Sequence, residues 1–225
     1  MAKQFQSDVI KTSVGDLTMT FLGHGTLMFE IRGAVIHIDP YGQVADYGEL
    51  PKGDLVLITH EHGDHLDLGA LAKIRTGKTK VVCTPSCASR VEDGILMKNG
   101  DERTVAGIRI EAVPAYNVRH ERAPGQPFHP QGVGNGYLLT FGDTRVYVAG
   151  DTEDTPEMRE LSGIDVAFLP MNLPYTMSPA MVADAVKAFK PRVVYPYHYG
   201  QTDPTELVAL LRDEAGVEVR IRDLA

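Results

Sequence analysis

Residues 59–65 read T-H-E-H-G-D-H, and this segment constrains the 225-residue chain more than any other feature. It directly follows residues 55–58, a short apolar run typical of a buried strand. The candidate ligands His60, His62, Asp64 and His65 then follow within six residues. A lone histidine is more often structural, but imidazole nitrogen and carboxylate oxygen together are ligands that zinc and similar metals prefer. This density therefore predicts a metal site.

The spacing within the segment indicates two ions. His60 and His62 lie two residues apart and can converge on one ion, and Gly63 lets the chain turn so that Asp64 and His65 reach a second. We therefore predict two divalent metal ions as cofactors. Zinc is favoured, with manganese, nickel or iron as alternatives.

Short β-branched or aromatic runs that end at Gly, Pro, Asp or Asn predict the strands. These runs are 17–21, 27–31, 35–38, 55–59, 81–84, 108–113, 137–141, 145–149, 166–170, 193–196 and 217–221. Helical patterns cover 67–74, 88–91, 156–161, 179–189 and 204–214. Strands come first as antiparallel pairs and later alternate with helices, which favours two packed sheets with helices outside. Without a linker-like stretch, we expect one domain over residues 1–225, with 117–135 as a long structureless loop.

The net charge of −8, with acids and bases interspersed, argues against nucleic acid or an anionic membrane as a partner, so a small-molecule substrate is expected. Cys83 and Cys87 are too few for a disulfide framework and are interpreted as structural thiols. Neither a signal peptide nor a membrane span is evident, which predicts a cytoplasmic protein unless a leader once preceded Met1. The sequence leaves open whether the chain forms a homo-oligomer.

The histidine-rich segment resembles the H-x-H-x-D-H signature of the metallo-β-lactamase superfamily. The resemblance extends over nearly the whole chain, through I-D-P at 38–40, A-G-D-T at 149–152 and Y-H-Y at 197–199. It implies an α/β protein with a four-layer αββα sandwich. It also implies that Asp151 bridges the two ions and that His198 joins Asp64 and His65 around the second.

Asp151 and His198 each have a local interpretation as well. Asp151 follows a strand, where a carboxylate beside a cation is stabilised in its charged form. The alternative is that it caps the following helix. His198 also follows a strand, and its alternative is a core histidine bonded to a neighbour.

The first ion needs a third protein ligand, which the superfamily usually supplies in a stretch resembling G-H-T-P-G-S-x-x-Y. Residues 128–132, F-H-P-Q-G, resemble it better than P-A-Y-N at 114–117, so His129 is the predicted ligand and 117–127 an insertion. Asn117 could instead bind the metal through its amide oxygen or face the substrate. His120 is a remote alternative.

His24 lies between two strands in a glycine-flanked turn, L-G-H-G-T at 22–26. This turn and the early I-D-P resemble the branch that holds ascorbate-6-phosphate lactonase-like proteins and many uncharacterised metal-dependent hydrolases. More distantly they resemble the N-acyl-phosphatidylethanolamine phospholipase D family. We predict that His24 lies beside the metals or the substrate, against the alternative of a structural turn histidine. Asp39 is predicted to support a ligand histidine through its other ring nitrogen.

These features predict a metal-dependent hydrolase. A hydroxide held by two ions would attack an ester, lactone, amide or phosphodiester of a small substrate, with Asp64 orienting the water or accepting its proton. His24, Tyr175 and Tyr199 are candidates for protonating the leaving group. The alternatives are a di-iron redox protein or a non-catalytic metal-binding sensor. Because iron variants usually replace a signature histidine by a carboxylate, the intact His60 and His62 favour hydrolysis.

Specificity is expected from loops 117–127 and 171–177, with Asn117, Tyr175 and Tyr199 as predicted substrate contacts. Arg119 and Arg122 are candidate phosphate partners. The G-x-G-x-G pattern at 132–136 precedes a strand and not a helix, which argues against a phosphate loop.

Overall fold

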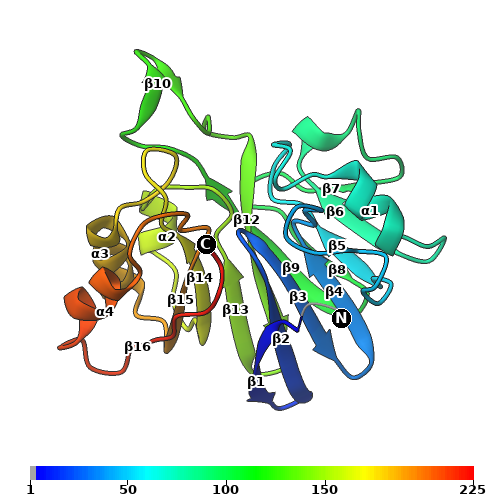
Figure 1. Ribbon diagram of the computed structural model, residues 1–225, viewed down its shortest axis with the longest axis horizontal. Coiled ribbons are helices and arrows are strands. Elements are labelled where there is room, and N and C mark those ends of the chain that lie inside the picture. The colour runs from blue at the N-terminus through cyan, green and yellow to red at the C-terminus, as the bar shows by residue number, and fades with distance from the viewer. Residues whose placement is uncertain (1–3) are drawn as a thin grey trace.

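The computed structural model describes residues 4–225, which form two facing seven-stranded sheets with helices on their outer faces (Figure 1). Helix α1 covers one sheet, and α3 and α4 cover the other. This is the predicted four-layer αββα sandwich. None of the helices in residues 4–225 has the length and apolar character needed to cross a bilayer.

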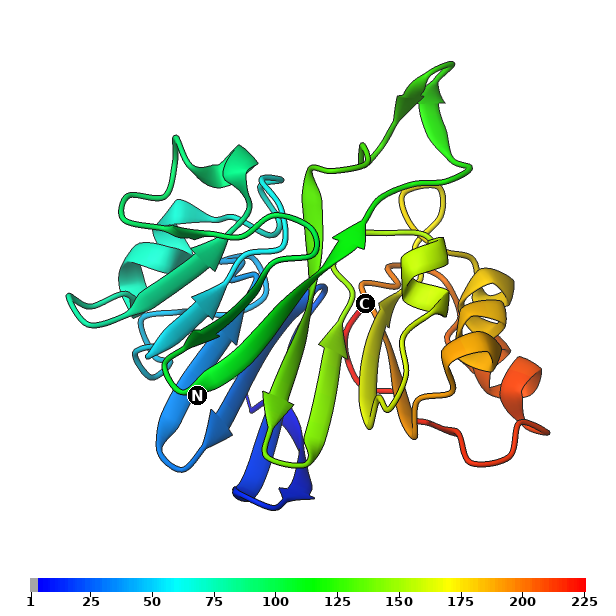
Figure 2. The ribbon, with the colours of Figure 1, turned by 180° about the vertical axis from the view of Figure 1, so that it is seen from behind.

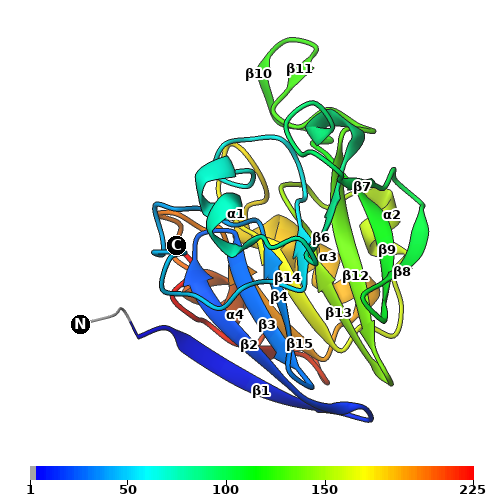
Figure 3. The ribbon, with the colours of Figure 1, turned by 90° about the vertical axis from the view of Figure 1, so that its right-hand side faces the viewer.

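The first sheet takes its strands in chain order. It contains β1 (Gln6–Thr12), β2 (Gly15–Gly23), β3 (Thr26–Ile31), β4 (Ala34–Ile38), β5 (Leu55–Leu57), β6 (Lys80–Cys83) and β7 (Ile95–Leu96). Strands β1 to β4 pair antiparallel, and β4 to β7 pair parallel. Edge strand β1 extends along the base of the molecule in Figure 3.

The second sheet has the order β16-β15-β14-β13-β12-β9-β8. Its strands are β8 (Glu102–Val105), β9 (Ile108–Ala115), β12 (Gly134–Phe141), β13 (Thr144–Val148), β14 (Val166–Pro170), β15 (Val193–Tyr197) and β16 (Glu218–Val219). Strands β8, β9, β12 and β13 pair antiparallel, and β13 to β16 pair parallel.

Within residues 4–225, four α-helices lie in connections between parallel strands: α1 (Leu68–Ile74), α2 (Pro156–Arg159), α3 (Pro179–Phe189) and α4 (Thr205–Leu211). Local signals set their starts. The Asp67 side chain accepts the first free backbone N–H groups of α1, and the Ser178 hydroxyl does the same for α3, which has proline at its first position.

Alternation along the strands builds two apolar cores. In β5 the side chains of Leu55 and Leu57 face the core between the sheets, whereas Val56 joins the core beneath α1. The same alternation places Phe29 inward and Met28 outward on β3. Both faces of this sheet are therefore covered, as expected for parallel strands with connecting helices.

Several expectations were wrong in detail. Residues 88–91 form turns after a short 3₁₀ helix at Pro85–Cys87. The stretch 117–135 is not structureless, because β10 (Glu121–Ala123) and β11 (Gln126–Pro127) form a hairpin that projects beyond the sheets (Figure 2). Strands β1, β7 and β8 were not predicted, since they are short or largely exposed and lack a clear apolar pattern.

Candidate metal centre

The site lies where several strands end at one edge of the two sheets. Residues 60–66 follow β5, Asp151 follows β13, and His198 follows β15. Because the carboxyl ends of parallel strands share an edge, side chains far apart in sequence meet there. The β2–β3 turn brings His24 to the same edge, and the chain between β11 and β12 brings His129.

The first group of histidines has three members, His60, His62 and His129. One ring nitrogen from each lies within 4.8 Å of the others. His60 and His129 are buried, and His62 is partly exposed. The structure thus brings together the three histidines predicted for one ion. His120, the remote alternative, instead places Nδ1 2.5 Å from a carboxylate oxygen of Glu153.

A second group combines Asp64, His65 and His198 with His24, again with ligand atoms within 4.8 Å of one another. Asp64 Oδ2 lies 3.8 Å from His65 Nε2 and 3.7 Å from His198 Nε2. The structure therefore brings together the three residues predicted for the second ion, and His24 lies beside them.

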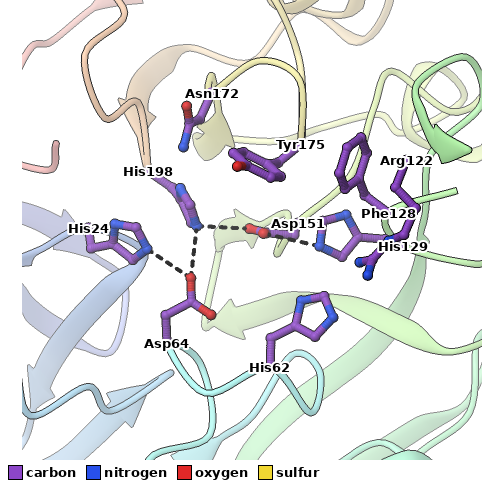
Figure 4. Close-up of a pocket in the computed structure, with 10 residues that line it drawn as sticks. All are labelled: His24, His62, Asp64, Arg122, Phe128, His129, Asp151, Asn172, Tyr175 and His198. Atoms are coloured by element: carbon purple, nitrogen blue, oxygen red, sulfur yellow. Dashed lines mark hydrogen bonds and ion pairs between the residues drawn. The ribbon is translucent and has the colours of Figure 1, made fainter.

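Asp151 lies between the two groups. Its Oδ1 is 3.4 Å from His65 Nε2. Figure 4 shows its contacts with the other two histidines: Oδ1 is 3.5 Å from His198 Nε2, and Oδ2 is 3.3 Å from His129 Nε2. The preceding Gly150 makes the turn with φ of +66°, and a Cβ there would lie 2.9 Å from the Asn135 carbonyl oxygen. One carboxylate therefore faces both histidine groups.

Buried polar atoms at the site lack hydrogen-bond partners within residues 4–225. They are Nε2 of His60 and His65, both ring nitrogens of His198, and Oδ1 of Asp151. Buried polar atoms are almost always paired, so an unpaired set that converges requires an explanation. Imidazole nitrogens and carboxylate oxygens at this spacing fit divalent cations such as zinc.

The electrostatics also suit cations. Burial lowers the pKa of His60 well below its ordinary value, so its ring is neutral and offers a lone pair. Burial disfavours ionised Asp151, but the imidazoles of His198 and His65 outweigh it and hold the Asp151 pKa well below its usual range. Burial also disfavours charged His65, yet Asp151 and Asp39 raise the His65 pKa well above its ordinary value. A cation at His65 therefore displaces a proton.

The loop that carries the signature is braced from two sides. Asp39 Oδ1 accepts the Thr59 backbone N–H at 2.8 Å, at the start of the loop. The Arg90 guanidinium donates to the carbonyl oxygens of Glu61 and Leu66 at 2.6 and 3.1 Å. The predicted pairing of Asp39 with a histidine is confirmed for His65, whose Nδ1 lies 2.8 Å from Asp39 Oδ2.

Backbone strain concentrates here as well. His24, Asp39 and His198 adopt φ of 54°, 47° and 47°, in the left-handed region that non-glycine residues rarely occupy. The His198 N–H donates to the His24 carbonyl oxygen at 3.1 Å, and the His24 N–H donates to the Ala225 carbonyl oxygen at 3.1 Å. These tertiary hydrogen bonds hold His24 and His198 in a backbone conformation that their local preferences disfavour.

Asn117 was predicted to contact the substrate, but it does not line the pocket and instead bonds His129. Its Oδ1 accepts the backbone N–H of His129 at 2.7 Å and lies 3.0 Å from His129 Nδ1. Its Nδ2 donates to Glu153 and to the Tyr175 carbonyl oxygen. Asn117 therefore orients the His129 ring. The same function has been described for carboxylates and carbonyls behind metal-binding histidines.

Glu153, the fully buried carboxylate behind this loop, was not singled out from the sequence. It accepts the backbone N–H groups of Val118, Arg119 and His120 at 2.6 to 2.9 Å. Its position two residues after Asp151, in the acidic stretch D-T-E-D at 151–154, was the only local signal.

Above these groups lies a pocket of about 490 Å³, a size that suits a small ligand. Its lining consists of His24, His62, Asp64, Arg122, Phe128, His129, Asp151, Asn172, Tyr175 and His198 (Figure 4). Tyr175 thus lies where it was predicted. Tyr199 does not line the pocket, because its hydroxyl donates to the Arg222 carbonyl oxygen at 2.8 Å. Asn172 and Phe128 were not singled out from the sequence.

Comparison with known proteins identifies the family. A family model described as "Beta-lactamase superfamily domain" matches residues 18–198. The chain belongs to this family. Within the superfamily it is 37% identical over 219 residues to a protein of Thermococcus onnurineus named UPF0173 metal-dependent hydrolase, covering 88% of this chain and 93% of that one.

Two solved structures of the superfamily fold are similar to this chain. A candidate metal-dependent hydrolase from Parabacteroides distasonis is 46% identical, with a TM-score of 0.94 and coverage of 99% of this chain and 100% of that one. Igni18, a metallo hydrolase from Ignicoccus hospitalis, is 27% identical, with a TM-score of 0.75 and coverage of 93% and 96%. The predicted membership of the metallo-β-lactamase superfamily is confirmed.

Proposed function

We propose that the protein is a hydrolase that uses two divalent metal ions to cleave an ester, lactone, amide or phosphodiester bond in a small substrate. One observation carries the proposal: the two oxygens of Asp151 face two different groups of ligand atoms at 3.3 to 3.5 Å. The first ion would be held by His60, His62 and His129, the second by Asp64, His65 and His198. Metal-dependent hydrolysis is also what the names of the similar proteins state.

Metal ions bound there supply Lewis acidity, which lowers the pKa of a coordinated water and polarises the substrate oxygen. The chain's own residues direct the protons. Burial disfavours ionised Asp64, but the imidazoles of His198 and His24 outweigh it and hold the Asp64 pKa far below its usual range. Asp64 is therefore a weak base. It orients the attacking water as a hydrogen-bond acceptor.

His24 is the proposed proton donor to the leaving group. Its Nε2 lies 3.1 Å from Asp64 Oδ2, and both side chains line the pocket. An N–H at Nε2 can donate to this carboxylate, and the same N–H is placed to donate to the departing oxygen or nitrogen when its bond to carbon or phosphorus breaks. Tyr199, another candidate from the sequence, is already bonded to the Arg222 carbonyl oxygen.

Metal analysis and a hydrolysis screen test the proposal together. Protein loaded with zinc or manganese and desalted is expected to hold two equivalents and to hydrolyse at least one member of an ester, lactone, amide and phosphodiester panel. Asp151→Ala is expected to lose metal and activity. Glu61→Gln is the control, since Glu61 lies inside the signature but bonds Ser86 at 2.6 Å and belongs to neither ligand group.

Other results would contradict the proposal. Two equivalents of metal with no turnover across the panel would support a metal-binding sensor. Bound iron with an oxygen-dependent absorption band would support a redox protein. Wild-type activity in Asp151→Ala would exclude this site as the catalytic centre.

A further inference from the structure

One wall of the pocket carries a cationic side chain that the proposed chemistry does not use. Arg122 lies on β10 and lines the pocket near His129 (Figure 4). Its guanidinium makes no hydrogen bond or ion pair with any residue in the described range 4–225. Arg122 Cζ lies over the Phe128 ring, 5.5 Å from the ring centroid. The five N–H donors of this group therefore remain open for a ligand.

A second arginine on the same loop is already engaged. Arg119 Nη2 lies 3.8 Å from Asp154 Oδ2, and Arg119 does not line the pocket. Of the two arginines that sequence analysis offered as anion partners, only Arg122 is placed for that role.

An aromatic surface adjoins the guanidinium. The rings of Phe128 and Tyr175 meet edge to face, with centroids 5.1 Å apart and planes at 74°. Tyr175 comes from the loop after β14 and is 47% exposed, so a large part of its surface is free. Edge-to-face aromatic pairs offer apolar area for a further ring or hydrocarbon group.

The net charge of the pocket agrees with an anionic ligand. Its lining contains two carboxylates, Asp64 and Asp151, and one permanent cation, Arg122. With two divalent ions bound, positive charge exceeds negative charge, and the low-dielectric aromatic wall strengthens its effect on a ligand.

We propose that the substrate is a small anion with an aromatic or bulky apolar substituent, its anionic oxygens bound by Arg122 and its substituent packed on Phe128 and Tyr175. This inference rests on the proposed function, because it assigns the substrate class of the same pocket. Carboxylate and phosphoryl groups share the chemistry that a guanidinium recognises.

Binding of non-reactive probes to zinc-loaded protein tests the inference without turnover. By calorimetry, Arg122→Ala is expected to weaken the binding of phenylphosphonate by about tenfold or more, as for loss of a charge-assisted hydrogen bond. The neutral dimethyl phenylphosphonate should bind wild type and Arg122→Ala within about twofold of each other. Arg119→Ala removes the same charge from the same loop, and its affinity for phenylphosphonate should stay within about twofold of the wild-type value.

Tyr175→Ala tests the apolar half. The affinity for phenylphosphonate should fall by about threefold or more relative to the affinity for methylphosphonate. In Tyr175→Phe the ratio of these two affinities should stay at the wild-type value. Metal content is measured for each variant. Equal losses in Arg122→Ala and Arg119→Ala, or no loss in either, would overturn the assignment of Arg122.

Hydrolysis assays separate this inference from the proposed function and show whether the anionic group is a phosphoryl group or a carboxylate. Ethyl p-nitrophenyl phosphate is compared with neutral diethyl p-nitrophenyl phosphate, and p-nitrophenyl hemiglutarate with p-nitrophenyl hexanoate. The anionic member of at least one pair should have the higher kcat/KM, and this preference should fall in Arg122→Ala. Probe binding as expected without hydrolysis would refute the function and leave the inference standing. Hydrolysis without any charge preference would refute the inference alone.

Discussion

Asp39 Oδ2 and His65 Nδ1 lie 2.8 Å apart, and both side chains are fully buried. The other carboxylate oxygen of Asp39 accepts the Thr59 N–H, so one residue fixes both the start of the signature loop and the ring of one of its histidines. With Nδ1 occupied, only Nε2 of His65 is free to face Asp151.

Asp39→Asn is therefore expected to weaken metal binding while the protein stays folded. The amide can still accept the Thr59 N–H, but it pairs less strongly with the His65 ring, and loss of such a partner typically lowers metal affinity by about 10- to 100-fold. Competition with a chromogenic chelator measures the change. Asp46→Asn, at an exposed acid bonded to Lys73, is the control that should keep wild-type affinity. Unchanged affinity in Asp39→Asn would show that the pairing does not orient the ligand.

Asn117→Ala should affect the first ion selectively. Without the amide oxygen, the His129 ring loses its partner at Nδ1, and the ion that we propose His60, His62 and His129 to bind would be held less firmly. We expect metal content after dialysis to fall from two equivalents towards one. Retention of both ions would mean that packing alone holds His129 in place.

Glu153→Gln should lower the free energy of unfolding by about 2 kcal/mol near neutral pH, because a buried carboxylate that accepts several N–H groups is lost. Burial would raise the Glu153 pKa, but the donors from His120 and Asn117 outweigh it and hold the pKa below the ordinary value of 4.5. The stabilisation is thus complete above that value and is lost as pH falls through the lower folded pKa.

Urea unfolding of wild type and Glu153→Gln, measured at several pH values, checks this prediction. The difference between the two proteins should be largest at pH 6 to 8 and should shrink below about pH 4.5. A difference that stays constant through this range would exclude ionised Glu153 as its source.

His24→Gln separates proton donation from positioning. If His24 protonates the leaving group, kcat should fall by about 100-fold for an alkyl ester, whose alkoxide needs a proton, and far less for a p-nitrophenyl ester. Metal content should stay at the wild-type level. An equal loss for both esters would instead assign His24 the task of holding Asp64 in place.

Two glycines of the G-x-G-x-G pattern differ in their roles, because Gly136 allows close packing whereas Gly132 allows a turn of the backbone. A Cβ on Gly136 would lie 2.7 Å from the Ala149 carbonyl oxygen and 3.0 Å from Tyr147 Cε2, so Gly136→Ala should destabilise the protein by about 2 to 3 kcal/mol. Gly132 has φ of +83° and open space around it, so Gly132→Ala should cost only about 1 kcal/mol. Urea unfolding compares the two, and equal costs would contradict the packing explanation.

The sequence by itself determined the main strands, the αββα architecture and the signature loop. A short apolar run is a local pattern, so strands such as β3 and β5 could be predicted directly from it. Likewise, His60, His62, Asp64 and His65 are neighbours along the chain, and their shared chemistry is visible without a fold. Resemblance to a family added His129, Asp151 and His198, which lie far from the signature in sequence.

Only the tertiary structure decided which way the remaining polar side chains face. Asn117 and Tyr199 belong to loops at the site edge, yet one bonds His129 and the other the Arg222 carbonyl oxygen. Arg119 and Arg122 are three residues apart, and only Arg122 enters the pocket. The physical reason is that loop side chains are directed by turns, hairpin geometry and buried partners such as Glu153, and these interactions join residues that no local pattern connects.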